Sequence, residues 1–282
     1  MIDSLAPVTL DELNDAAALQ TRRDRKYVLT PDELVDLLSA LPPARVLEIG
    51  GARSFAYEST YFDTPDLDAY HLAAMRRRRR FKVRTRTYVD SGSCFVEVKT
   101  RAGRGTTVKE RQPHDDADEL GVARAFVSAR LADAGAPSAP VLAPTLRSRY
   151  RRTTLLLDDA RVTLDTGLVW ELLVPDGAGP HAGRHVDPAG PAVRRSAAIG
   201  DRVVVETKTA AGSGPSSVDR LLWRAGHRPD RISKYATGLA LLVPVLPDAP
   251  WRRLVRRRLG LPTRTTTPTP TTTDLNDERN PS

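Results

Sequence analysis

Hydrophobic and polar residues alternate with a period of two along eight segments of the chain. Because successive side chains of a strand point to opposite faces of a sheet, this alternation predicts strands. The eight segments are residues 23–30, 54–64, 80–90, 93–102, 106–112, 146–159, 160–173 and 201–210. Turn residues join several of them into hairpins, at Asp90-Ser91-Gly92, Gly103-Arg104-Gly105 and Asp158-Asp159-Ala160.

Helical periodicity interrupts these strands in four segments, residues 30–41, 115–135, 216–226 and 235–246. The first begins with Thr30 and Pro31, and Glu33 follows three residues after the threonine. This spacing predicts a capping box with proline at the first helical position. The two periodicities together predict an α+β domain with a mainly antiparallel sheet.

The two ends of the chain differ in composition from the body, residues 22–247, which we predict to form one domain. Residues 1–21 form an N-terminal lead segment, and residues 262–282 are a Thr/Pro-rich tail with too few apolar residues to fold. Between body and tail, residues 248–261 contain a predicted basic amphipathic helix at 251–259. Its apolar face either packs on the domain or makes a peripheral membrane or partner contact.

Targeting signals are missing from the sequence. The N-terminus carries acidic residues where a signal peptide needs a basic start, and no stretch approaches the roughly 20 apolar residues of a spanning helix. We therefore predict a cytoplasmic protein without a transmembrane segment. The single cysteine, Cys94, excludes an internal disulfide framework and a cysteine-based zinc site.

Positive charge gathers on one face of the predicted strands. The chain has 43 Lys and Arg residues against 35 Asp and Glu residues, a formal net charge of +8 that favours polyanionic partners. The densest stretch is "RRRRRFKVRTRTY" at residues 76–88, where alternation places Lys82, Arg84 and Arg86 on one face. The same alternation gives basic residues a shared face in other strands, at Lys26, Lys99, Lys109, Arg111 and Lys208.

Cations on neighbouring strands repel one another, so an anionic ligand should compensate them. Asp24, Glu97 and Glu206 lie among these cations, a pattern that suits a divalent metal ion bridging phosphate oxygens. A polar sheet face that meets water is the alternative for any single strand. The run Arg76 to Arg79 either recruits anions at the mouth of a site or is simply solvated.

Two other classes of phosphate binder are disfavoured. Aromatic residues make up 5% of the chain and few interleave with the basic positions, which argues against single-stranded nucleic acid. The glycine-rich loops GxGxxG and GxxxxGK[ST] do not occur. Side chains must therefore hold the ligand, and we predict a closed antiparallel β-barrel of about eight strands, with its polar face inward and helices packed outside.

Nine short motifs resemble, in order, those of the VTC-domain polyphosphate polymerases, which belong to the triphosphate tunnel metalloenzymes related to the CYTH domain. They include "RRDRKYVL", "KVRTRTY", "VEVKT", "TVKER", "VVVETK" and "RISKYATGL", and extend from about Arg22 to Leu242. The resemblance implies a tunnel in which basic side chains grip triphosphate or polyphosphate. It also implies Mn²⁺ or Mg²⁺ as cofactor and transfer of the γ-phosphate of ATP to a growing polyphosphate chain.

The resemblance, together with the shared basic face, assigns roles to individual residues. The cations predicted to act in catalysis are Lys26, Arg84, Arg86, Lys99, Lys109 and Lys234. Further substrate-binding residues are Arg111, Tyr150, Arg152, Arg161, Arg231 and Ser233. The metal ligands are Glu206, Asp24 and Glu97.

Some positions depart from the family pattern and leave alternatives open. Arg22 and Asp24 stand where tunnel triphosphatases and CYTH cyclases carry glutamates, and Arg231 replaces a lysine. Hydrolysis of inorganic or nucleoside triphosphate, or polyphosphate binding without catalysis, therefore remains an alternative to polymerisation. Tyr150 could instead simply pack, and Ser233 could cap the following helix. Oligomeric state, chain length and the choice between Mn²⁺ and Mg²⁺ stay open.

Overall fold

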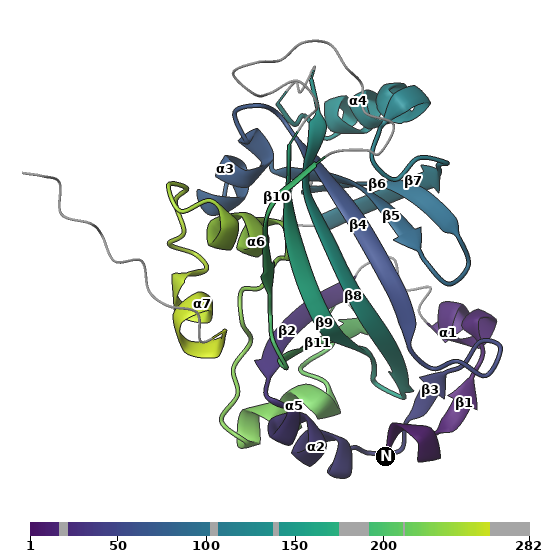
Figure 1. Ribbon diagram of the computed structural model, residues 1–282. Helices are drawn as coiled ribbons and strands as arrows, with labels where there is room; N and C mark the ends of the chain where they lie inside the picture. Colours follow the sequence, from purple (N-terminus) through teal and green to yellow (C-terminus); the bar gives the residue numbers. More distant parts are fainter. Residues whose placement is uncertain (17–21, 102–106, 138–140, 175–191, 211, 260–282) are drawn as a thin grey trace, which may run out of the picture.

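The protein is built around one strongly curled sheet with helices at its outside (Figure 1). The computed structural model describes residues 1–282 except 17–21, 102–106, 138–140, 175–191, 211 and 260–282. Its strands are β1 (Ala6–Val8), β2 (Arg22–Leu29), β3 (Arg45–Leu47), β4 (Phe55–Asp63), β5 (Phe81–Tyr88), β6 (Ser93–Arg101), β7 (Thr107–Pro113), β8 (Ala143–Leu157), β9 (Ala160–Val174), β10 (Ala192–Ala198) and β11 (Val203–Ala210). Its α-helices are α1 (Leu10–Ala16), α2 (Pro31–Ser39), α3 (Asp68–Ala74), α4 (Arg124–Asp133), α5 (Ser217–Arg224), α6 (Lys234–Leu242) and α7 (Arg252–Arg258).

Eight strands follow one another in the order β2-β11-β9-β8-β4-β5-β6-β7, and every neighbouring pair is antiparallel. They correspond to the eight segments with period-two alternation, so the predicted antiparallel α+β class is confirmed. The strands β1, β3 and β10 lie off this path. β10 pairs with β9, and β1 and β3 form a parallel pair beside β8.

The prediction of a closed barrel is wrong, because the sheet is an open half-barrel. Within the described part of the chain, β2 pairs only with β11 and β7 only with β6. The outer edge of β2 is already occupied: Asp230 N donates to Lys26 O at 2.6 Å, and Val28 N donates to Asp230 Oδ2 at 3.1 Å. A covered edge cannot pair with another strand. At Lys26 and Val28 the edge of β2 is therefore bonded to the segment before α6 and not to β7.

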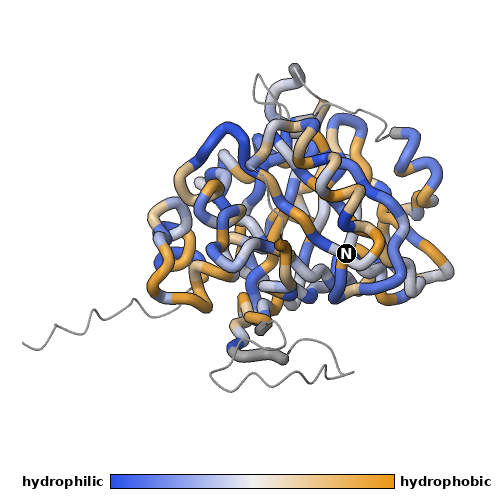
Figure 2. Tube along the Cα trace, turned by 90° about the horizontal axis from the view of Figure 1, so that it is seen from above, coloured by the Kyte–Doolittle hydropathy of each residue, from blue (hydrophilic) through white to orange (hydrophobic). Residues whose placement is uncertain are grey.

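Alternation along the strands separates core from cavity, as the sequence predicts. In β11, Val203 and Val205 are buried in a cluster that includes Leu222 of α5, whereas Glu206 and Lys208 face the inside of the half-barrel. Figure 2 shows hydrophilic and hydrophobic residues interspersed along the trace. A second and larger cluster, which includes Trp170 of β9, packs α6 against the sheet.

The ends of the domain also pack on it. The Thr30 and Glu33 capping box of α2 is present as predicted. Trp251, the N-cap of the basic helix α7, and Leu254 within the helix are buried, and the Trp251 ring lies 5.4 Å from that of Tyr70 in α3. No helix of the described residues is long and apolar enough to cross a membrane. The predicted disordered tail and the turn at 103–105 lie outside the described residues.

Part of the lead segment is folded onto the sheet. β1 pairs with β3, and Leu13 of α1 packs with Val8 and Leu47 in a small apolar cluster. Helix α1 consequently lies beside β3 at one end of the half-barrel (Figure 1). This position matters because α1 contributes to the cavity described next.

Candidate functional site

The inner face of the half-barrel encloses a cavity of about 520 Å³. Strands from both ends of the sheet contribute to it, together with α1 and the start of α6. Eleven basic side chains and three carboxylates of the described residues line it. The basic ones are Lys26, Lys82, Arg84, Arg86, Lys99, Lys109, Arg111, Arg152, Arg161, Lys208 and Lys234, and the carboxylates are Asp24, Glu97 and Glu206.

One wall of the cavity is formed by β5, β6 and β7, and we refer to it as the β5–β7 wall. In its centre Arg84 Nε and Nη2 donate to Glu97 Oε2 at 2.8 and 2.5 Å, and Lys109 Nζ lies 2.6 Å from Glu97 Oε1. Burial alone would raise the pKa of Glu97, but Arg84, Arg86 and Lys109 outweigh burial and lower it. Glu97 is therefore a charged group enclosed by cations.

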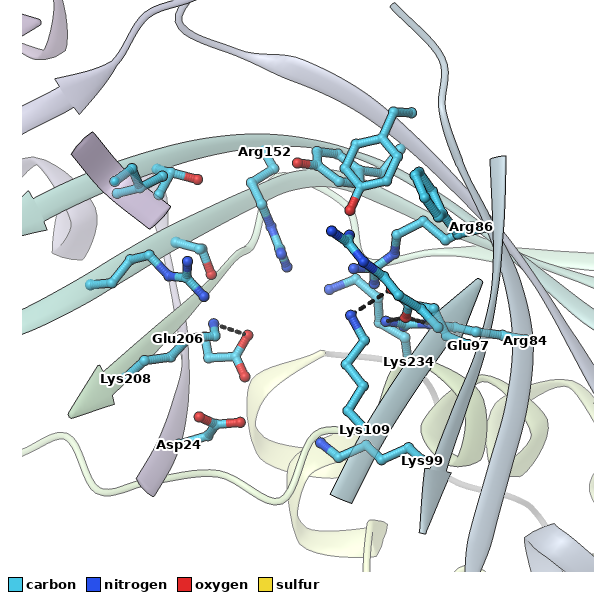
Figure 3. A pocket seen from close by; sticks show the side chains of 18 of the residues that line it. Asp24, Arg84, Arg86, Glu97, Lys99, Lys109, Arg152, Glu206, Lys208 and Lys234 are labelled. Atoms are coloured by element: carbon cyan, nitrogen blue, oxygen red, sulfur yellow. Dashed lines mark hydrogen bonds and ion pairs between the residues drawn. The ribbon is translucent and has the colours of Figure 1, made fainter. Parts of the chain in front are cut away.

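The opposite wall is formed by β2 and β11, and we refer to it as the β2–β11 wall. Glu206 lies 2.7 Å from Lys208 and 3.8 Å from Lys26. In the register of the two strands Lys208 pairs with Asp24, which places Asp24 and Glu206 diagonally on one face. Figure 3 shows the two carboxylates next to each other, with Glu97 on the far side of the cavity. Burial alone would raise the pKa of Glu206, but Lys208, Lys26 and Arg152 hold it well below its usual range.

The buried carboxylate of Asp165 contacts both Arg152 and Lys234, two cations that the sequence predicts to belong to the site. Asp165 in β9 accepts from Arg152 Nε at 2.6 Å and from Arg152 Nη2 at 2.8 Å, and it also accepts from Lys234 Nζ. It therefore fixes a cation of β8 relative to a cation of α6. Asp165 was not among the residues predicted for the site, although period-two alternation places it on the same face as Arg161 and Thr163.

Tyr150 packs behind these cations rather than lining the cavity. Its ring is stacked on that of Tyr57, with the centroids 5.3 Å apart. Lys234 Nζ lies 4.1 Å from the Tyr150 centroid, and the Arg152 guanidinium lies 5.3 Å from it. An aromatic face attracts a cation at such distances. The structure thus favours packing for Tyr150, and its role as a substrate ligand remains a prediction.

Lys82 lines the cavity, although it was not among the residues predicted for the site. Its Nζ donates to Ser233 Oγ at 2.7 Å, and the same oxygen accepts from Ala236 N at 3.3 Å at the start of α6. Ser233 is therefore both a helix cap and a lining residue. Burial, together with Lys26 and Lys99 nearby, lowers the pKa of Lys82 well below its usual range.

Most of the residues that the sequence predicts for the site line the cavity. Of the fifteen residues predicted for the site, all except Tyr150 and Arg231 line the cavity. Arg231 is exposed and lies outside this lining, so its role as a substrate ligand has no support in the geometry and stays a prediction. The run Arg76 to Arg79 is likewise exposed, in the connection between α3 and β5, and does not line the cavity.

The carboxylates of the cavity can hold a metal ion only together with oxygen atoms of a bound phosphate. Among the described residues, no group of three or more His, Cys, Asp or Glu side chains is close enough to hold a metal by itself. The two oxygens of Glu97 are taken by Arg84 and Lys109. Asp24 and Glu206 lie next to each other on the opposite wall, and Mg²⁺ is commonly bound through one or two carboxylates together with phosphate oxygens and water. This pair therefore fits a metal that a phosphate ligand helps to coordinate.

Solved structures with similar architecture are distant from this chain. A candidate adenylate cyclase from Bacillus halodurans is 14% identical at a TM-score of 0.46, covering 76% of this chain and 94% of its own. One from Vibrio parahaemolyticus is 12% identical at a TM-score of 0.42, covering 78% and 98%. A candidate adenylyl cyclase from Hippeastrum, with a dominant triphosphatase activity, is 17% identical at 0.43, covering 80% and 98%. Similarity at this level does not transfer an activity.

Comparison with sequences gives a clearer result. No curated protein matches the chain. A family model described as the VTC domain, however, matches residues 21–243, a span that contains the whole sheet path and the start of α6. The chain therefore belongs to the VTC-domain family.

Proposed function

We propose that the protein is a metal-dependent polyphosphate polymerase that transfers the γ-phosphate of ATP to a growing polyphosphate chain. The observation that carries this proposal is the convergence of cations from both walls on one cavity that also contains the pair Asp24 and Glu206. Membership of the VTC-domain family supports phosphate-chain chemistry in this cavity.

Phosphoryl transfer requires mainly that the reactants are positioned and that their charge is neutralised. Arg84, Arg86 and Lys109 would neutralise the transferring phosphoryl group from the β5–β7 wall. Arg152 and Lys234, fixed by Asp165, would hold it from the side of β8 and α6. Because Arg84, Lys109, Arg152 and Lys234 are held by ion pairs before the ligand arrives, little reorganisation is needed during the reaction.

Asp24 and Glu206 would hold Mn²⁺ or Mg²⁺, whose charge would neutralise phosphate oxygens. A terminal oxygen of the acceptor chain forms the new bond to the γ-phosphorus, the bond to the β–γ bridging oxygen breaks, and ADP leaves with that oxygen. The acceptor oxygen is already an anion, so no side chain has to remove a proton from it.

Hydrolysis of a triphosphate is the second candidate, and the open edge of the half-barrel favours it. Among the described residues β2 and β7 do not pair, and the Lys109 side chain on β7 is 35% exposed, so water reaches this part of the cavity. In hydrolysis a water molecule would replace the acceptor chain. The products distinguish the two reactions.

The test is to incubate the purified protein with ATP and Mn²⁺ and to analyse the products. We expect ADP and long-chain polyphosphate, and loss of at least about 100-fold in rate for Glu206→Gln. Glu110→Gln is the control, because Glu110 lies on β7 facing away from the cavity, where Arg130 donates to it. Orthophosphate without chain growth would support hydrolysis instead. Binding of triphosphate without turnover by folded protein would contradict both reactions.

A further inference from the structure

A tyrosine of β4 that the sequence did not assign to the site, Tyr61, also lines the cavity. Its ring is stacked on that of Tyr235 in α6, with the centroids 5.3 Å apart. The Tyr235 hydroxyl donates to the buried carboxylate of Asp63, which also accepts from three backbone N–H groups between residues 64 and 70. These contacts behind the cavity fix the Tyr61 ring before a ligand arrives.

The hydroxyl of Tyr61 lies among cations. Arg84 Nη1 donates to Tyr61 Oη at 3.1 Å, while Nε and Nη2 of the same guanidinium donate to Glu97. Burial alone would raise the pKa of this phenol, but Arg84, Arg86 and Lys234 outweigh burial and lower it. The surroundings of the hydroxyl therefore favour negative charge.

The hydrogen of this hydroxyl lacks an acceptor in the protein. The Tyr61 oxygen already accepts from Arg84, which leaves its one hydrogen to donate. Arginine and lysine carry donors only, so the cations that surround Tyr61 cannot accept it. None of the residues that the structure describes accepts a hydrogen bond from Tyr61, whose exposed fraction is 3%. The acceptor must therefore come from whatever fills the cavity.

We infer that the Tyr61 hydroxyl donates a hydrogen bond to a phosphate oxygen of the substrate, beside the contact that Arg84 makes with that phosphate. The inference rests on the proposed function, because it concerns the substrate of the same cavity. A hydrogen bond to a charged oxygen is roughly twice as strong as one between neutral groups. The arginines and lysines attract the charge of the phosphate, whereas the rigidly held phenol adds a directional bond. Tyr61 is thus a substrate-contacting residue that orients the phosphate.

The same bond should change the ionisation of Tyr61 when a ligand binds. A phosphate oxygen that accepts the hydrogen stabilises the neutral phenol, and the phosphate charge opposes a tyrosinate. Bound triphosphate should therefore raise the pKa of Tyr61. The neighbouring lining residue Tyr57 does not interfere, because burial raises its pKa to about 12.

The first part of the test measures binding of a non-hydrolysable triphosphate analogue with Mg²⁺ by calorimetry near neutral pH. Tyr61→Phe removes only the hydroxyl and keeps the ring that stacks on Tyr235, and Arg84 keeps its bonds to Glu97. We expect Tyr61→Phe to bind the analogue about tenfold more weakly.

Tyr235→Phe is the matched control. It removes the hydroxyl of the other ring in the same stack, which donates to Asp63 and does not line the cavity. This variant should bind the analogue within about twofold of the original protein.

The second part follows the near-ultraviolet absorbance of tyrosinate as the pH is raised. Below the ordinary tyrosine pKa of 10.0, we expect the original protein to form more tyrosinate than Tyr61→Phe does. A saturating concentration of the analogue should abolish this difference. The measurement requires no further variant, and the analogue itself does not absorb.

Equal affinity of Tyr61→Phe and the original protein, or an equal loss in Tyr235→Phe, would overturn the inference. So would a tyrosinate difference that is absent without the analogue or that persists when the analogue is bound. Neither part depends on turnover. Weaker binding by Tyr61→Phe, in a protein that makes no polyphosphate, refutes only the polymerase, whereas polyphosphate synthesis with unchanged affinity in Tyr61→Phe refutes only the role of Tyr61.

Discussion

Each wall of the cavity carries a glutamate among lysines and arginines, yet the two carboxylates have different neighbours. Glu97 on the β5–β7 wall has 2% of its side chain exposed and contacts Arg84 on one oxygen and Lys109 on the other. Glu206 on the β2–β11 wall has Lys208 at 2.7 Å and a second carboxylate, Asp24, beside it.

The difference shows that residue type and face do not determine the role of a carboxylate. Glu97 has its charge fully compensated, so it serves to hold Arg84 and Lys109 in place. Glu206 also contacts two cations, Lys208 and Lys26, but it shares its wall with a second carboxylate, Asp24. Two adjacent carboxylates can hold a divalent cation together with phosphate oxygens. We therefore propose that Glu97 organises the site and that Glu206, with Asp24, holds the metal.

The largest expected effect is on stability. Glu97→Gln removes the buried counter-charge of Arg84 and Lys109, and removing one partner of a buried ion pair commonly costs about 3 kcal/mol or more. We expect the free energy of unfolding in urea to fall by about 3 kcal/mol, against about 1 kcal/mol for Glu206→Gln. Saturating triphosphate should restore more stability to Glu97→Gln than to the original protein, since the anion replaces the lost charge. Equal losses in both variants would remove the distinction between the walls.

The next effect concerns metal binding. Asp24→Asn and Glu206→Gln should each weaken Mn²⁺ binding to the triphosphate-loaded protein by about tenfold or more. Glu97→Gln should leave the Mn²⁺ affinity within about twofold, provided that the protein is folded at the temperature used. Electron paramagnetic resonance of free Mn²⁺ measures these affinities directly. Weaker Mn²⁺ binding in Glu97→Gln alone would reverse the assignment.

The smallest effect is a pH dependence that the two walls share. Burial lowers the pKa of Lys109 and of Lys208 to about 8, against an ordinary value of 10.5. Both lysines lose charge as the pH rises through 8, so triphosphate affinity should fall several-fold between pH 7 and 9.5. Bound phosphate favours the charged amines, so binding near pH 8.5 should take up protons. Calorimetry in buffers of different ionisation enthalpy measures this uptake, and Lys109→Arg and Lys208→Arg should reduce it.

The same two pKa values determine how the stability of the unliganded protein changes. Between pH 8 and 10.5 the unfolded state holds more protons on Lys109 and Lys208 than the folded state does. Their contribution to stability therefore rises with pH across this interval. Saturating triphosphate should reduce that rise. A liganded protein with the same pH dependence as the free protein would place the ligand away from these lysines.

Alternation in the sequence was sufficient to predict which residues face the cavity. It placed Arg84, Arg86, Lys99 and Lys109 on one face, and the structure brings all four to the lining. It could not predict that the barrel stays open. Nor could it predict that Asp230 occupies the edge of β2 at Val28, a contact between residues 202 positions apart in the chain.

The sequence also could not reveal residues that act by holding other residues in place. Asp165 is important because Arg152 and Lys234 meet on its carboxylate, and nothing local in "RVTLDT" reveals that meeting. The pair β1 and β3 was missed for a similar reason, since three-residue strands show no measurable alternation. A motif match also does not determine where each side chain points. Arg231 is exposed, although Ser233 and Lys234 of the same motif line the cavity.

The most direct test of the central claim, that the two walls bind one phosphate chain between them, is a crystal structure with a non-hydrolysable ATP analogue and Mn²⁺. We predict phosphate oxygens within hydrogen-bond distance of Arg84 and Arg152, and Mn²⁺ on Asp24 and Glu206. A phosphate chain bound instead to the exposed arginines at 76–79 or on α7, with the cavity free of it, would contradict the account.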